Sequence, residues 1–378
     1  MAVLKQTPVI SVKGKPFDCG LQHGTQAREL IRRNLANYFR RWQATWGAER
    51  SEILRKCHQL VPVIGEYDND ILEELQGLAR GADLSLEEII ALNARYELIW
   101  GERVVRFFSG GCTSVAALPE VTRDGHTIIG MNWDNAPILT DMLILLEVEQ
   151  PGKPKVVVST EAGLLGLKGT NSTGLGMCVN GLVSAKDKFD PTCVPFLLMM
   201  RSALNAENFT RSLQAILRAK CGVPGNLLFA HRDGETIDLE VTPDDVGIVH
   251  DKDGILTHSN HFLTFTNRAD FKDLFKKFVP NSLFRYHRAR RLLEMDRGHI
   301  DIASFQRVFR DHFSYPDSIC WHVNPKDDEH NQTKTLNSII MDLTEGTMYL
   351  SEGNPCEKEY VRLTPFAQKA RARNRVTI

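Results

Sequence analysis

The feature that most constrains the fold is a run of short strand-like segments between residues 112 and 182. Each segment is apolar or β-branched and only a few residues long, and turn formers such as Arg123-Asp124-Gly125 and Pro151-Gly152 stand between segments. The segments are CTSVAAL, TIIGMNW, MLILLEVEQ, KVVVSTE and GLGMCVNGL. Their hairpin-like spacing favours antiparallel sheets over parallel βαβ units.

Blocks of helical and strand-like sequence alternate along the whole chain. Apolar residues at helical spacing occupy residues 24–100, 195–220 and 282–312, with an expected helix end at Gly47 and a helix start at Ser85. Strand-like segments return at 226–241, at 254–262 and from 335 onward. We therefore expect an α+β fold, in which two antiparallel sheets stack face to face with helices outside them in four αββα layers.

Composition excludes several classes of function. The 378 residues include 46 basic and 47 acidic side chains, so net charge gives no reason to expect a nucleic-acid or membrane partner. The first twenty residues lack the pattern of a signal peptide, and no run of about 18 apolar residues occurs. Eight cysteines show no CxxC pair or metal-ligand spacing. We expect reduced thiols, no bound metal or cofactor, and a cytoplasmic location.

The segment Phe108–Glu120, FSGGCTSVAALPE, places a cysteine directly behind two glycines and at the start of a strand. A cysteine is a strong nucleophile only as a thiolate, so it needs a base or a lowered pKa. If the bond before Cys112 is cut, Cys112 gains a free α-amino group, whose pKa of about 7.7–8.0 suits general-base work near neutral pH. The nucleophile would then carry its own base.

Cys112 could make this cut itself. Its sulfur would attack the carbonyl of Gly111 and form a thioester, which water would resolve. Gly110 and Gly111 favour this step because glycine reaches strained conformations and carries no Cβ to block the carbonyl. Thr113 and Ser114 could hydrogen-bond around the site. The alternative is an inert cysteine buried at the start of a strand, which is common in proteins.

Residues around Cys112 resemble the N-terminal-nucleophile hydrolases, in particular the isopenicillin N acyltransferase family. The similar motifs are GGCTS at 110–114, GMNWDN at 130–135, GTNSTGLGMCVNGL at 169–182, THSNHF at 257–262, YPDSICWHVN at 315–324 and TLNSIIMDLTEGTMYL at 335–350. The resemblance covers about residues 10–365. It implies a four-layer αββα sandwich and maturation by cleavage between Gly111 and Cys112.

The resemblance assigns roles residue by residue. Cys112 is the nucleophile, Asp134 holds the α-ammonium and the sulfur, and Asn260 donates a hydrogen bond to the oxyanion. Asn180 is a second donor or a substrate contact. The further site candidates are Thr113, Asn132, Ser282, Arg285 and Trp321. His258 and His261 flank Asn260, and we expect them to be core or supporting residues rather than zinc ligands.

Trp321 departs from the family pattern, because relatives commonly have an arginine after Ser-Ile-Cys. The replacement is expected to remove a cation near the catalytic centre, which leaves the charge of the substrate open. The basic residues on the stretch 282–291 are otherwise expected to form a solvated helix face.

The resemblance divides the chain into a helical pro-segment, residues 1–111, and a catalytic part, residues 112–378. The cut pro-segment is expected to stay bound. Three functions remain open. The first is hydrolysis of a small N-acyl amide, such as a conjugate of an amino acid or amine. The second is transfer of the acyl group from acyl-CoA to an amine. The third is a non-catalytic relative that binds an amide. The oligomeric state is also left open.

Overall fold

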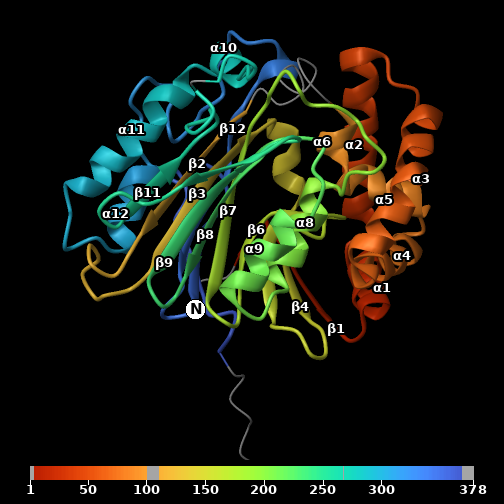
Figure 1. Ribbon diagram of the computed structural model, residues 1–378, viewed down its shortest axis with the longest axis horizontal. Coiled ribbons are helices and arrows are strands. Elements are labelled where there is room, and N and C mark those ends of the chain that lie inside the picture. The colour runs from red at the N-terminus through yellow and green to blue at the C-terminus, as the bar shows by residue number, and fades with distance from the viewer. Residues whose placement is uncertain (1–3, 100–109, 267, 368–378) are drawn as a thin grey trace, which may run out of the picture.

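Two β-sheets stack face to face in the computed structural model, which describes residues 4–99, 110–266 and 268–367. Helices cover the outer sides of the stacked sheets (Figure 1). Every described strand pair is antiparallel except that of β1 with β4. The expected α+β fold with two antiparallel-dominated sheets is confirmed.

The six-stranded sheet carries the Gly-Cys motif at one strand end. Its order is β11-β2-β3-β12-β13-β14. The strands are β2 (Cys112–Ala117), β3 (Ile128–Asn135), β11 (Ile255–His258), β12 (Lys334–Asp342), β13 (Thr347–Ser351) and β14 (Val361–Leu363). Cys112 lies opposite Trp133 in the pairing of β2 with β3. The Asn-Trp-Asp motif therefore lies beside the Gly-Cys motif, and β11 leads to Asn260 on the other side of β2.

The eight-stranded sheet has the order β1-β4-β5-β6-β7-β8-β9-β10. Its strands are β1 (Val9–Lys13), β4 (Leu143–Glu149), β5 (Val156–Glu161), β6 (Lys168–Asn171), β7 (Leu175–Gly181), β8 (Gly225–His231), β9 (Glu235–Val241) and β10 (Val246–Val249). Asp233 and Gly234 form the predicted hairpin turn, where Gly234 has φ +90°. β1, β6 and β10 were not predicted, because they are short or, in the case of β1, isolated among helical sequence.

Most helices fall where the apolar spacing predicts them, but the helices at Pro16–Gln26 and Phe275–Phe278 lie largely or wholly outside the predicted ranges. The N-terminal helices are α1 (Pro16–Gln26), α2 (Arg28–Trp46), α3 (Arg50–Tyr67), α4 (Asn69–Ala82), α5 (Leu86–Asn93) and α6 (Arg95–Leu98). The later helices are α8 (Phe196–Leu204), α9 (Phe209–Leu217), α10 (Phe275–Phe278), α11 (Asn281–Glu294) and α12 (Ile302–Phe309), with 3₁₀ turns at Pro137–Met142 and Glu329–Asn331. As predicted, α2 ends at Gly47, which has φ +67°, and Ser85 caps α5.

Alternation along β2 distributes its side chains between two cores. Ala116 packs in the large core between the sheets, whereas Val115 and Ala117 pack with Ala289 of α11 and Phe305 of α12. This strand is therefore buried on both faces, which holds its first residue, Cys112, in a fixed position. None of the helices in the described ranges has both the length and the apolar character needed to cross a membrane.

The N-terminal segment is part of the same core. β1 pairs with β4 over five residues, and α1–α5 contribute buried side chains to the core between and beside the sheets. The Arg95 guanidinium and the Glu161 carboxylate, both fully buried, lie 2.6 Å apart and join α6 to β5. The segment is thus mainly helical, as expected, but it also supplies an edge strand to the sheet; residues 100–109 lie outside the described part.

Candidate active site

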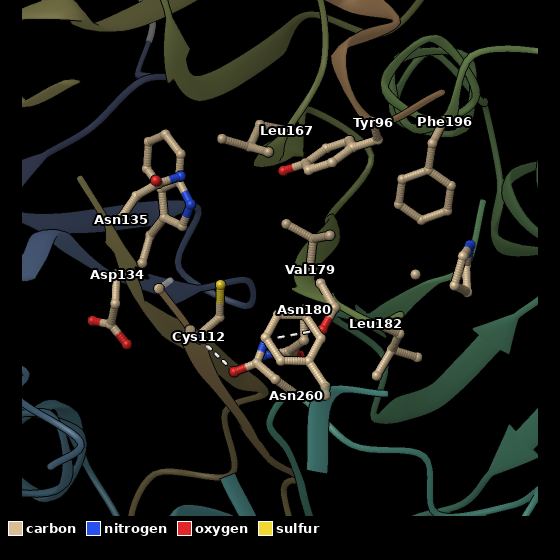
Figure 2. A pocket seen from close by; sticks show the side chains of 17 residues that line it. Tyr96, Cys112, Asp134, Asn135, Leu167, Val179, Asn180, Leu182, Phe196 and Asn260 are labelled. Atoms are coloured by element: carbon tan, nitrogen blue, oxygen red, sulfur yellow. Dashed lines mark hydrogen bonds between the residues drawn. The ribbon is translucent and has the colours of Figure 1, made fainter. Parts of the chain in front are cut away.

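A pocket opens between the two sheets at the N-terminal end of β2. Cys112 directs its sulfur into the pocket, and Asn180, Asn260 and the apolar side chains of Val179 and Leu182 surround it (Figure 2). The apolar lining also includes Tyr96, Trp133, Leu167, Phe196, Pro224 and Phe275. Asp134 is the one charged residue among the described residues that line the pocket. The pocket therefore suits an apolar, uncharged acyl group better than a charged one.

The two glycines before Cys112 are needed for steric reasons. A Cβ on Gly110 would come within 2.2 Å of the carbonyl oxygen of Asp134. A Cβ on Gly111 would lie 2.7 Å from Nη2 of Arg285 and 2.8 Å from Oδ1 of Asn260. All three distances are too short for a Cβ unless the neighbouring atoms shift, so the motif lets the backbone approach the site closely.

The peptide bond between Gly111 and Cys112 is held at both ends. The backbone N–H of Asp134 donates to the carbonyl oxygen of Gly111 at 2.8 Å. The backbone N–H of Cys112 donates to Oδ1 of Asn260, also at 2.8 Å. This bond is therefore fixed beside the Cys112 sulfur, with a hydrogen-bond donor already on the carbonyl oxygen that would become negative if the carbon were attacked.

Two asparagine side chains offer N–H groups to the pocket. Nδ2 of Asn260 donates one hydrogen to the carbonyl oxygen of Gly181 at 3.0 Å and retains a second. Oδ1 of Asn180 accepts from Asn226 at 3.1 Å, while its buried Nδ2 has no hydrogen-bond partner. Both amides are thus oriented by their neighbours and can donate to a new oxygen in the pocket.

Arg285, from α11, is a fully buried cation directly behind Cys112. Its Nη1 donates to the carbonyl oxygen of Cys112 at 2.7 Å and to Oγ1 of Thr113 at 2.9 Å. Its Nη2 donates to Oδ1 of Asn260 at 2.9 Å. The side chain lies over the ring of Trp321, 5.6 Å from the ring centre. The sequence led us to expect that Trp321 removes a cation near the catalytic centre. The structure places another cation there, the guanidinium of Arg285.

Asp134 is buried on β3, and its Oδ1 accepts a hydrogen bond from Oγ1 of Thr335 at 2.6 Å. Burial raises the pKa of Asp134 to about 7, against the lowering effects of Arg285 and Thr335. Burial and the Asp134 carboxylate raise the pKa of the Cys112 thiol to about 12, against the effects of Arg285 and Lys168. In the uncut chain the thiol is therefore protonated at neutral pH and needs a base.

The remaining predicted residues support the pocket from outside it. Oγ of Ser282 accepts from the backbone N–H of Asn260 at 2.7 Å and lies 2.8 Å from Nδ1 of His261, so it positions the Asn260 loop. His258 is buried against Glu240 at 2.9 Å. Asn132 lies farther away, since its Nδ2 donates to the carbonyl oxygens of Phe309 in α12 and of Ile319 in the loop before β12, and so ties β3 to that helix and that loop.

Sequence reasoning missed Lys168 of β6. The side chain is fully buried, Nζ has no hydrogen-bond partner, and it lies 3.9 Å from the centre of the Trp133 ring. Burial lowers the pKa of Lys168 to about 7, against the raising effects of Cys112 and Glu161. No motif marks this residue, because it reaches the site from the other sheet. Thr335 was missed because only the pairing of β12 with β3, within the six-stranded sheet, places it opposite Asp134.

We predict that Lys168→Met stabilises the protein at low pH. The pKa of Lys168 is lower in the folded chain, about 7, than in the unfolded chain, about 10.5. The buried cation therefore lowers the stability of the fold by its full amount below pH 7, and this cost disappears above pH 10.5. The gain in unfolding free energy should be about 2 kcal/mol at pH 6, after loss of the contact with Trp133, and close to zero above pH 10.5. Denaturant titrations at both pH values measure it. Equal effects at the two pH values would contradict the burial of an unpaired cation.

We predict that Thr335→Val moves the acid limb of the pH profile to higher pH. The hydroxyl donates to Asp134 and so lowers its pKa; without it the carboxylate ionises at higher pH. If ionised Asp134 is required together with the neutral α-amine, kcat/KM well below about pH 7 should fall about tenfold relative to the wild type, and the acid limb should move to higher pH. Thr335→Ser keeps the hydroxyl and is the matched control. An unchanged limb in Thr335→Val would show that Asp134 ionisation does not control turnover.

None of the described side chains that could hold a metal ion as a group lines this pocket. The site consists of a thiol beside a clamped peptide bond, amide donors, a buried carboxylate and a buried guanidinium. Groups of these types, held together in one pocket, can support chemistry in which an acyl group is transferred from an amide.

Comparison with known proteins agrees with this class. The sequence model of the acyl-coenzyme A:6-aminopenicillanic acid acyl-transferase family matches residues 121–357. The chain belongs to this family, and it is an enzyme of the hydrolase and acyltransferase class that acts on acyl amides. The match includes Asp134, Asn180, Asn260 and Arg285, whereas Cys112 precedes it.

One curated relative and two solved structures illustrate the similarity. The acyl-coenzyme A:6-aminopenicillanic-acid-acyltransferase 40 kDa form of Emericella nidulans is 28% identical over 315 residues, which cover 82% of this chain and 84% of the relative. A C2A mutant of conjugated bile acid hydrolase from Clostridium perfringens has a TM-score of 0.43 at 15% identity, covering 67% of this chain and 96% of the other. Penicillin V acylase from Agrobacterium tumefaciens has a TM-score of 0.37 at 11% identity, covering 65% and 76%. The two structural likenesses are too weak to bear on the chemistry.

Proposed function

We propose that the chain cuts its own Gly111–Cys112 bond and that the matured enzyme then hydrolyses a small N-acyl amide through a Cys112 thioester. The observation that carries the proposal is the clamp on the scissile bond, in which Asp134 donates to the Gly111 oxygen and Asn260 accepts from the Cys112 nitrogen. A peptide bond held in this way beside a sulfur is oriented for attack.

The cut proceeds in two balanced steps. The Cys112 sulfur attacks the carbonyl carbon of Gly111 while its proton passes to water, and the oxygen takes up negative charge opposite the Asp134 N–H. The bond from this carbon to the Cys112 nitrogen then breaks and the nitrogen takes up one proton from water, so this step leaves a thioester between Gly111 and the Cys112 sulfur and a free α-amine on Cys112. Water attacks the thioester in the second step, which yields the Gly111 carboxylate and the free thiol.

Cleavage also supplies the base that the thiol lacks. A thiol with a pKa of about 12 is a poor nucleophile at neutral pH. The new α-amine has an ordinary pKa of about 7.7–8.0 and sits on the same residue, so it takes the thiol proton during attack on the substrate. Asn260 and Asn180 donate to the substrate oxyanion. The negative charge of the buried Asp134 carboxylate offsets the positive charges of Arg285 and of the protonated amine.

Residues 1–111 are proposed to remain bound after cleavage as a small subunit beside the catalytic part, residues 112–378. Support comes from the pairing of β1 with β4 and from two buried charge contacts, Arg95 with Glu161 and Arg201 with Glu74. Separation would expose the apolar faces of α1–α5 to water, which opposes dissociation.

Acyl transfer to an amine is the second candidate function. The family match and the Emericella relative, both named for transfer from acyl-coenzyme A, favour it. Transfer and hydrolysis share the Cys112 thioester and differ in whether an amine or water resolves it. In both cases the apolar pocket would take the acyl group, and an acyl-CoA thioester would be an acyl donor in the transfer reaction.

Incubation of the purified protein with a panel of N-acyl amides and acyl-CoA thioesters, each with and without an acceptor amine, separates these functions. Release of free acid from an amide without acceptor supports hydrolysis. Formation of a new amide from acyl-CoA supports the transferase. Binding of amides without turnover by a chain that has been cut at Cys112 would contradict both and support a non-catalytic binding protein.

A further inference from the structure

Four potential metal ligands meet outside the active site, although the sequence shows no metal-ligand spacing and led us to expect no metal. They are His312, Cys320, His322 and Cys356, and their ligand atoms all lie within 4.8 Å of one another. His312 follows α12, Cys320 and His322 belong to the loop before β12, and Cys356 follows β13. Three separate segments, at residues 312, 320–322 and 356, thus converge on one point, which is why the spacing gave no signal.

Four of the six distances between these atoms are close to the edges of a metal-centred tetrahedron, and all six are within 4.8 Å. The two sulfur atoms are 3.5 Å apart, and the two histidine Nε2 atoms are 3.1 Å apart. Nε2 of His322 lies 3.6 Å from Sγ of Cys320 and 3.3 Å from Sγ of Cys356. Bond lengths of about 2.3 Å to sulfur and 2.0 Å to nitrogen give edges of about 3.8, 3.3 and 3.5 Å for the sulfur–sulfur, nitrogen–nitrogen and mixed pairs.

Hydrogen bonds among the four side chains do not explain why their ligand atoms lie so close together. Nε2 of His322 has three close neighbours, namely His312, Cys320 and Cys356. An imidazole nitrogen has one lone pair or one hydrogen, so it makes one good hydrogen bond at a time. A cation at the centre of the group would satisfy all four ligand atoms together.

Groups around the four ligands are those that a thiolate–imidazole site uses. Oε1 of Glu357 lies 3.6 Å from Nδ1 of His322, where it favours a proton on Nδ1 and leaves Nε2 free to bind. Nδ2 of Asn354 points at Sγ of Cys320 from 3.5 Å and also donates to the carbonyl oxygen of Trp321 at 2.7 Å. An N–H aimed at sulfur stabilises a thiolate.

We propose that His312, Cys320, His322 and Cys356 bind one Zn²⁺ ion in a tetrahedral site. Two thiolates with two imidazoles are a ligand set that zinc prefers, and binding releases the two thiol protons. Four protein ligands leave no open position, so the site is structural rather than catalytic.

The zinc site would fix a loop that contacts active-site residues from outside the pocket. Trp321 stands between two of the ligands, and its backbone N–H donates to Oγ1 of Thr335 at 2.9 Å. The same hydroxyl donates to Asp134. Trp321 also lies against Arg285. The ion would therefore fix the loop that holds both the buried carboxylate and the buried guanidinium.

Metal analysis of the full-length wild-type protein, purified without chelator, tests the site independently of catalysis. We expect about one zinc ion per chain, loss of that zinc to a strong chelator, and uptake of Co²⁺ in its place. The cobalt form should show the intense visible and thiolate charge-transfer bands of tetrahedral sulfur coordination. A lower thermal midpoint after zinc removal should accompany these changes.

Single substitutions identify the ligands. Cys356→Ser and His312→Ala should each lose the bound zinc and the cobalt bands, whereas His250→Ala, which removes an exposed histidine elsewhere, should retain both. These measurements also apply to an uncut or inactive chain, so they can fail while the proposed function stands. A wild-type chain that takes up neither metal, with Cys320 and Cys356 either free or joined as a disulfide, would overturn the proposal. Equal zinc content in wild type and Cys356→Ser would do the same.

Discussion

Cys112→Ala is expected to leave the chain whole and to abolish turnover. The wild-type chain of 42.7 kDa should give fragments of about 12.5 and 30 kDa, in proportion to the 111 residues before the cut and the 267 after it. Alanine has no sulfur to attack the Gly111 carbonyl or to form the thioester, so both the cut and the reaction should fall to background. Denaturing gels and a turnover assay measure the two effects.

Cys178→Ala is the matched control for this experiment. Cys178 is fully buried on β7 and faces the same core, but it does not line the pocket. This variant should be cut and should remain active, at a modest cost in stability. If Cys112→Ala is cut like the wild type, another group makes the cleavage and the proposed mechanism is wrong.

Asn260→Asp is expected to separate self-cleavage from turnover. The carboxylate keeps an oxygen for the Cys112 N–H and for Arg285, so the clamp on the scissile bond survives. The side chain loses the N–H that faces the substrate, and loss of one such donor costs about 10²- to 10³-fold in kcat, or about 3–4 kcal/mol. The variant should therefore still give two fragments while its kcat falls by this factor.

Asn132→Ala provides the comparison, because the Asn132 side chain on β3 contacts α12 and the loop at Ile319 instead of the pocket. It should lower stability and leave kcat of the folded enzyme near the wild-type value. Turnover by Asn260→Asp at the wild-type rate would exclude Asn260 as the oxyanion donor and leave Asn180 as the main candidate.

Local patterns were sufficient to predict the elements that carry the catalytic motifs. The strands at Cys112 and at Asp134 follow from short apolar runs bounded by turns, and the capped helix at Ser85 follows from its own first turn. Asn260 could be placed near Cys112 only through the resemblance. The structure explains this juxtaposition, because β11 pairs with β2 and ends one residue before Ser259.

Features that depend on strand order could not be predicted. Lys168 reaches the centre across the gap between the sheets, and Thr335 faces Asp134 through a pairing of strands about 200 residues apart. Arg285 was read partly as a solvated residue because its neighbours are basic, yet it is fully buried. The group around Cys320 gave no signal, since its four members come from three separate segments.

Mass spectrometry of the active wild-type enzyme, combined with sequencing of its new N-terminus, tests the central claim most directly. We predict that turnover belongs to a two-fragment species whose larger fragment begins at Cys112 with an unmodified α-amine. Full activity from an intact 378-residue polypeptide, in which the nitrogen of Cys112 is still an amide, would contradict the account.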